Sequence, residues 1–73
     1  MHKIIHKSIR DGQVLDMIYM TNERTFTKRW IKVYRLQGES FKAYCFLRKS
    51  IRTFKLANVL ALVPVEKKAS VDV

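Results

Sequence analysis

Two arginines, Arg48 and Arg52, are the side chains best suited to bind a ligand, because they lie on either side of a short polar turn at Lys49 and Ser50. The surrounding stretch, residues 41–56, alternates in polarity and is rich in aromatic and β-branched residues, which predicts a β-hairpin. Alternation places these residues together on one face of their strands: Phe41, Ala43, Cys45 and Leu47, then Arg52, Phe54 and Leu56. A guanidinium group can hold phosphate or carboxylate with two parallel hydrogen bonds, so two arginines that meet across a turn predict an anion clamp.

Four further residues are candidates for the same ligand site. Lys42 and Lys55 lie within the hairpin and would add positive potential around the two arginines. Tyr19 and Tyr44 would shape the site or stack on a ligand, and the alternative for both tyrosines is a place in the core.

A separate surface pattern lies on the predicted strand over residues 26–36. One face of this strand alternates aromatic or apolar residues with cations: Phe26, Lys28, Trp30, Lys32, Tyr34 and Leu36. Aromatic side chains interleaved with cations suit a surface that stacks bases and follows phosphates. The sequence leaves open the alternative that Trp30 and Tyr34 pack at a sheet edge with lysine stems lying across them.

The charge distribution favours an anionic partner. The chain of 73 residues carries 15 Lys and Arg against 6 Asp and Glu, a formal net charge of +9. Between Arg24 and Lys55 there are ten Lys or Arg residues and one acid, Glu39. Such a field attracts nucleic acids, nucleotides or acidic protein surfaces, although part of it can simply solvate the outer face of a small sheet.

One short helix and five strands are the predicted elements. The helix covers residues 3–10 with Gly12 as a left-handed C-cap, and the strands outside the hairpin cover 14–20, 26–36 and 59–65. This order predicts a mainly β domain over residues 1–65, a small SH3-like or Sm-like five-strand barrel, followed by a polar tail at 66–73. The expected core contains Met17, Ala43, Cys45, Phe54 and Leu56, with Ile9 resting on the sheet.

Several function classes have no supporting pattern. His2 and His6 are four residues apart but no further ligands accompany them, so we expect no metal site and no cofactor. Cys45, the one cysteine, reads as a small buried hydrophobe, and no acid–base or nucleophile–base pair indicates an enzyme. The chain has no apolar run long enough for a membrane span and no secretory signal, so the cytoplasm is the expected compartment.

The hairpin resembles the end of a WYL domain. The residues that carry the resemblance are Ala43-Tyr44-Cys45, then Arg48, then the run Arg52-Thr53-Phe54-Lys55-Leu56. The similarity extends back to the stretch from Ile5 to Tyr19, with Ile9, Arg10, Gly12 and Met17, and covers roughly residues 4 to 62. Two positions depart from the family pattern: the Trp-Tyr-Leu tripeptide falls near Glu39-Ser40-Phe41 and is absent, and the arginine expected after Leu56 falls at about Asn58.

This resemblance implies a small bent barrel that works as a sensor. WYL domains are usually fused to a winged-helix DNA-binding domain in bacterial and phage transcription regulators, and their ligands include nucleotides and single-stranded nucleic acids. Because no helix-turn-helix fits this sequence, we expect a stand-alone sensor or binding module. The alternative is an adaptor that docks an acidic protein or forms a homodimer through an open edge strand. Arg52 also has a structural alternative, an ion pair with Glu39 or Asp16 that would stabilise the fold.

Overall fold

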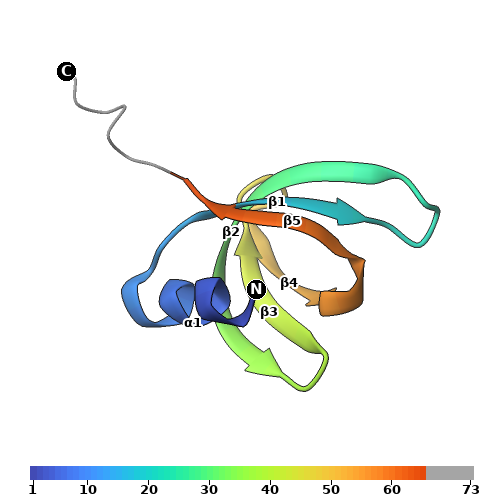
Figure 1. Cartoon of the computed structure of the whole chain (residues 1–73). Coiled ribbons are helices and arrows are strands. Elements are labelled where there is room, and N and C mark those ends of the chain that lie inside the picture. The colour runs from blue at the N-terminus through green and yellow to red at the C-terminus, as the bar shows by residue number, and fades with distance from the viewer. Residues whose placement is uncertain (66–73) are drawn as a thin grey trace.

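The computed structural model describes residues 1–65, which form one helix and five antiparallel strands. In chain order these are α1 (His2–Asp11), β1 (Leu15–Met20), β2 (Phe26–Gln37), β3 (Ser40–Cys45), β4 (Ser50–Lys55), the 3₁₀ turn η1 (Leu56–Asn58) and β5 (Val59–Pro64), as Figure 1 shows. The predicted mainly β class is confirmed. The predicted tail at 66–73 lies outside the described residues.

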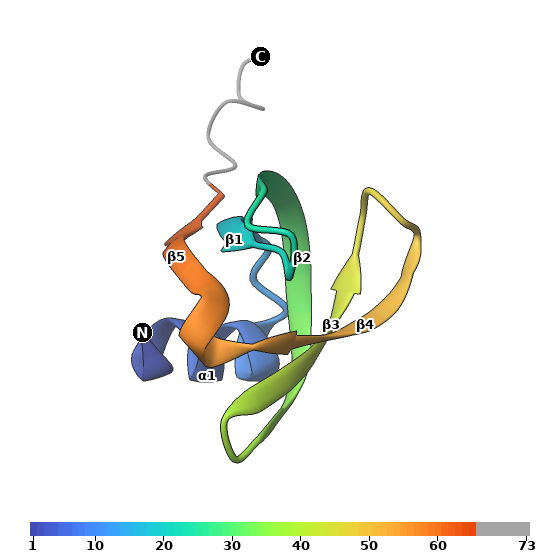
Figure 2. The ribbon, with the colours of Figure 1, turned by 90° about the vertical axis from the view of Figure 1, so that its right-hand side faces the viewer.

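The five strands make a single bent sheet that stops short of a closed barrel. Its order is β4-β3-β2-β1-β5, so β4 and β5 are the two edges and do not pair with each other. Figure 2 shows the β3–β4 turn standing apart from β1 and β5, while the other end of β4 leads through η1 into β5, so the sheet is open on the side of the turn. The predicted small five-strand barrel is therefore present as a strongly bent sheet, and no ladder joins its two edges within residues 1–65.

A bulge in β2 sets which of its side chains face the core. The register with β3 shifts between Val33 and Arg35, which leaves Tyr34 as the extra residue. Beyond it, Leu36 lies opposite the buried Phe41 and packs against the core. The predicted face that ran unbroken from Phe26 to Leu36 is therefore wrong after Tyr34, because one extra residue reverses the alternation.

The core largely matches the predicted set. Met17, Ala43, Cys45 and Phe54 are buried, and Leu56 packs against them while partly exposed. The remaining buried apolar residues are Ile5, Leu15, Ile31, Val33, Phe41, Val59 and Leu62.

The expectation for Ile9 is wrong, because its side chain is 39% exposed. The buried face of α1 carries Ile5 and Ser8, which lie three positions apart on one side of the helix. A residue directly after Ser8 is rotated by about 100° around the helix axis, which turns Ile9 towards solvent.

Ser8 fixes α1 to the sheet through two hydrogen bonds. Its fully buried hydroxyl donates to the Gln13 carbonyl at 2.7 Å and accepts from the Val33 backbone N–H at 3.0 Å, beside the bulge. The helix ends as predicted at Gly12, which has φ 72° and donates its N–H to the Ser8 carbonyl at 2.8 Å. The C-cap and the serine together set where the chain leaves the helix for β1.

We expect Ser8→Ala to destabilise the domain, because it leaves the buried Val33 N–H without an acceptor. Such a loss costs about 1–3 kcal/mol in the free energy of unfolding. For a domain of this size the melting temperature should fall by at least about 4 °C, measured by circular dichroism. The control is Ser50→Ala, because Ser50 is exposed and no hydrogen bond of its hydroxyl is found within residues 1–65. Equal melting temperatures for Ser8→Ala and the parent chain would contradict this role.

Candidate anion-binding pocket

The turn between β3 and β4 positions the first predicted arginine. Four residues, Phe46 to Lys49, connect the strands, and Cys45 pairs directly with Ser50. Lys49 closes the turn with φ 56° and donates its N–H to the Cys45 carbonyl at 2.7 Å. The predicted two-residue turn at Lys49 and Ser50 is therefore too short, and Leu47 lies exposed in the turn rather than in the first strand.

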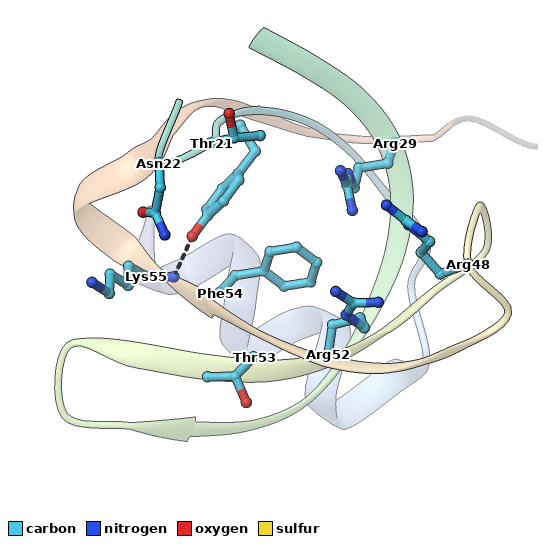
Figure 3. A pocket seen from close by; sticks show the side chains of 9 residues that line it. Thr21, Asn22, Arg29, Arg48, Arg52, Thr53, Phe54 and Lys55 are labelled. Carbon is cyan, nitrogen blue, oxygen red and sulfur yellow. Dashed lines mark hydrogen bonds between the residues drawn. The ribbon is translucent and has the colours of Figure 1, made fainter. Parts of the chain in front are cut away.

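Arg48 and Arg52 do meet on the concave side of the sheet, together with a third arginine. Arg52 lies opposite the buried Ala43, which places its side chain on the inner face of β4. Arg29 comes from the inner face of β2, and all three side chains line one pocket. Figure 3 shows the three guanidinium groups directed towards the same space.

The pocket occupies the open side of the sheet. Its volume is about 350 Å³, and its walls come from β1 and the following turn, from β2, from the β3–β4 turn and from β4. Lys55 borders the pocket on the side opposite the arginines, but its side chain follows the inward-facing Phe54 and is directed away from the three guanidinium groups (Figure 3). A volume of this size is at the lower end of the range for small-ligand sites, about 300–1,000 Å³.

Aromatic rings form one wall of the pocket. The Phe54 ring packs edge-to-face against Tyr19, with 5.0 Å between ring centroids and an interplanar angle of 77°. Behind it, Phe54 contacts Phe41, with centroids 5.6 Å apart. Because Phe54 itself is buried while it lines the pocket, the wall is part of the hydrophobic core and is held rigidly.

Arg29 is the residue that sequence reasoning missed. Its guanidinium carbon lies 5.8 Å from the centroid of Phe54, within the range of a cation–π contact, and Nη1 lies 3.7 Å from Sγ of Cys45. Its Nε is buried without a hydrogen-bond partner among the described residues. Alternation had already placed Arg29 on the same face as Ile31 and Val33, and a cation on a core-facing side was the signal that could have identified it.

Among residues 1–65, no carboxylate lines the pocket. Within residues 1–65, two acids form ion pairs, and both are elsewhere: Asp11 with Arg10 at 3.1 Å and Asp16 with Lys28 at 3.8 Å. The hydrogen bond from Arg10 lowers the pKa of Asp11. The alternative ion pair of Arg52 with Glu39 or Asp16 is not formed in the described part of the chain, so the positive charge in the pocket has no protein counter-ion there.

Tyr19 spans the open side of the sheet. Its hydroxyl oxygen accepts a hydrogen bond from the Lys55 backbone N–H at 2.9 Å, which links β1 to the end of β4 (Figure 3). Its ring also lines the pocket, so Tyr19 lies at the predicted site and carries a structural bond as well. The hydroxyl proton stays available to donate to a ligand, because the oxygen acts as the acceptor towards Lys55.

The other four predicted site residues lie on the opposite, convex face. Lys32 pairs with Tyr44, Trp30 lies opposite Asp16, and Lys42 follows the buried Phe41 and therefore points outward. Neighbouring residues of a strand point to opposite faces, which is why a single site that includes both groups is not formed. The structure divides the predicted set into an inner group with Arg48, Arg52, Tyr19 and Lys55, and an outer group with Trp30, Lys32, Lys42 and Tyr44.

The described residues contain no cluster of three or more His, Cys, Asp or Glu side chains that could hold a metal ion. His2 and His6 instead line a shallow basic surface of α1 with Lys3, Lys7 and Arg10. Over the same part of the chain, no helix has the length and apolar character that a bilayer crossing requires.

Comparison with known proteins gives a match among solved structures. No family model matches the chain, and no curated protein matches it. Among solved structures, the chain is similar to proteasome accessory factor B/C (PafBC) of Arthrobacter aurescens, with a TM-score of 0.72 and 28% sequence identity. The match covers 99% of this chain and 13% of the PafBC chain. It is consistent with the WYL-like fold that the sequence motifs imply.

We expect Tyr19→Phe to lower the free energy of unfolding by about 0.5–1.5 kcal/mol, because it removes the bond to Lys55 but keeps the ring against Phe54. Urea denaturation followed by circular dichroism measures the change. Tyr34→Phe is the matched control, since Tyr34 is exposed and its hydroxyl makes no hydrogen bond within residues 1–65. Equal losses in both variants would show that the bond across the open side contributes nothing.

Proposed function

We propose that this domain is a regulatory binding module whose arginine pocket takes a phosphate-bearing ligand, either a nucleotide or a segment of single-stranded nucleic acid. The observation that carries the proposal is the convergence of Arg29, Arg48 and Arg52 on a pocket that no carboxylate lines in the described part of the chain. Arg29 is partly buried and its Nε has no hydrogen-bond partner among the described residues, so this cation favours an anionic partner. Arg48 and Arg52 are exposed, and their guanidinium forks suit phosphate oxygens. The chemistry required is recognition, so the proposal involves no catalytic step.

The pocket offers a different contact for each part of a nucleotide. Phosphate oxygens would lie between the three guanidinium groups, and the apolar wall of Phe54 and Tyr19 would face the sugar or base. The Tyr19 hydroxyl proton and the Asn22 side chain add neutral hydrogen-bonding groups beside the charged ones. Because Arg29 is already held by Phe54 and Cys45, less conformational freedom is lost on binding than with three mobile arginines.

The structural neighbour supports the regulatory part of this proposal. The similarity of this chain to a segment of PafBC, a regulator with a WYL domain, supports a regulatory binding module. We further propose that the protein acts as a ligand sensor in bacterial or phage transcription regulation, and that it works in the cytoplasm. The single cysteine, reduced and buried in the core, fits such a compartment.

An acidic protein segment is the competing ligand for the same pocket. The outer edge of β4, which is not paired with another strand, would let an extended acidic peptide add to the sheet beside Arg52. Competition against labelled thymidine monophosphate distinguishes the two, because a nucleotide pocket should release this probe poorly to polyglutamate and readily to unlabelled thymidine monophosphate.

We expect Arg52→Lys, Arg48→Lys and Arg29→Lys each to weaken oligothymidylate binding by about one to two decades in Kd. Lysine keeps the charge but loses the planar fork, and a hydrogen bond to a charged group contributes about 1.5–3 kcal/mol. Fluorescence anisotropy of a labelled oligonucleotide measures the affinity, and circular dichroism melts test whether each variant remains folded.

The matched control is Arg10→Lys on α1, outside the pocket, where loss of the exposed pair with Asp11 should change little. Lys28→Gln, on the convex face, should mainly flatten the dependence on salt. An unchanged affinity in Arg52→Lys together with a lowered melting temperature would mean that Arg52 is structural and that the proposed site is wrong.

Oligothymidylate affinity should also fall steeply with salt. Each phosphate contact on a single strand contributes a slope of about −0.7 in log affinity against log salt concentration. Three to five contacts, three of them from the pocket arginines, give a slope between about −2 and −3.5. Anisotropy titrations from about 50 to 200 mM salt measure it. A slope near zero, or no binding at the lowest salt, would favour the acidic-partner alternative.

A further inference from the structure

The convex face of the sheet carries a row of aromatic and basic side chains that the arginine pocket does not use, and all of them are exposed except the half-buried Lys32. We call the row along β2 the outer strip; its members are Phe26, Lys28, Trp30, Lys32 and Tyr34. Phe26 is 65% exposed, Trp30 51% and Tyr34 48%. Three large aromatic side chains exposed in one row of a small domain indicate an interaction surface.

The strip continues across β3 and β4 to the turn that carries Arg48. Tyr44 lies opposite Lys32 on the same face, and Ile51 lies opposite Tyr44. The rings of Tyr44 and Phe46 pack edge-to-face with centroids 5.0 Å apart. The backbone N–H of Phe46 donates to the Trp30 carbonyl at 3.1 Å, which brings the turn directly beside Trp30.

We propose that the outer strip is a second contact surface for single-stranded nucleic acid, with bases stacked on Trp30 and Tyr34 and phosphates near Lys28 and Lys32. The inference rests on the proposed function for the class of ligand. It goes further in assigning a separate face, which a single mononucleotide in the pocket would not reach. The turn at residues 46–49 makes the two surfaces continuous, because Phe46 belongs to one side and Arg48 to the other.

The spacing along β2 matches this ligand. Side chains two residues apart lie on the same face at about 6.6–6.8 Å, so aromatic platforms and cations alternate at that interval from Phe26 to Lys32, and Tyr34 follows at the bulge. A single strand laid along β2 would therefore meet stacking surface and positive charge in turn. Sequence-independent single-strand binding combines these same two elements, aromatic platforms and a basic track.

The charges on this face favour nucleic acid over a protein or a second copy of the chain. The acid on the convex side of β1 is Asp16, opposite Trp30, and it already pairs with Lys28 at 3.8 Å. Lys32 and Lys42 make no ion pair within residues 1–65. Lysine is depleted at protein–protein interfaces, and two copies with a net charge of +9 each would repel one another.

Trp30 allows a direct test, because it is the only tryptophan in the chain. We expect an oligothymidylate of about 12 nucleotides, within the range of ~4–16 nucleotides for single-strand sites, to quench Trp30 fluorescence by stacking. Thymidine monophosphate should bind in the pocket, measured by calorimetry, and leave the Trp30 emission unchanged.

Trp30→Leu, which keeps apolar surface but removes the ring, should weaken oligothymidylate binding by about tenfold and leave thymidine monophosphate binding unchanged. Trp30→Phe should retain most of the affinity, since it keeps an aromatic face. Leu60→Ala on β5 is the control for loss of an exposed apolar side chain, since Leu60 is exposed to a similar degree, and it should change neither affinity.

The outcomes separate this inference from the proposed function. Unchanged oligonucleotide affinity in Trp30→Leu, together with no quenching of Trp30 fluorescence in the parent chain, overturns the strip and leaves the pocket standing. Unchanged binding of both probes in Arg52→Lys, with oligonucleotide binding lost in Trp30→Leu, supports the strip and overturns the pocket. If Trp30→Leu instead impairs only the binding of polyglutamate, the strip takes an acidic protein and the inference is overturned.

Discussion

The alternation of side chains along β2 is the constraint on which both surfaces depend. This strand is the longest of the sheet and pairs with β1 and β3, so each of its residues is committed to one face. Arg29 points inward to the pocket and the next residue, Trp30, points outward to the convex face. Two neighbouring residues thus lie on opposite faces of a single-layer sheet. Only a shift of the strand register by one residue could exchange their faces.

The bulge at Tyr34 lets the same strand also complete the core. If the alternation continued through Tyr34 without a bulge, Leu36 would face solvent and Arg35 would face the core. The bulge reverses that outcome and lies beside Val33, whose N–H reaches Ser8 of the helix. One extra residue therefore lets Leu36 face the core on the same side of β2 as Ile31 and Val33.

Sequence alone predicted the elements and much of the core, because hydrophobic alternation and turn residues are local signals. It also brought Arg48 and Arg52 to one place, since a hairpin fixes the neighbours of its own strands. Arg29 was missed because its role depends on which distant strand faces it. The helix was predicted with Ile9 inward, but its rotation is set by Ser8, whose partner Val33 lies 25 residues away. Closure of the sheet likewise depends on how its two edges end in space, which no local pattern encodes.

The single bond between Tyr19 and Lys55 across the open side has a thermodynamic consequence. An anion bound between Arg29 on β2 and Arg52 on β4 would add a second link between strands around the open side of the sheet, beside the bond of Tyr19 to Lys55. Ligand and architecture would then be linked, since whatever binds only the folded state adds to its stability. Ligand binding would then reduce the motion of the edge strand β4 and of η1, the segment that connects β4 to β5. A small domain of this kind can respond to ligand binding by becoming more rigid, without any change of fold.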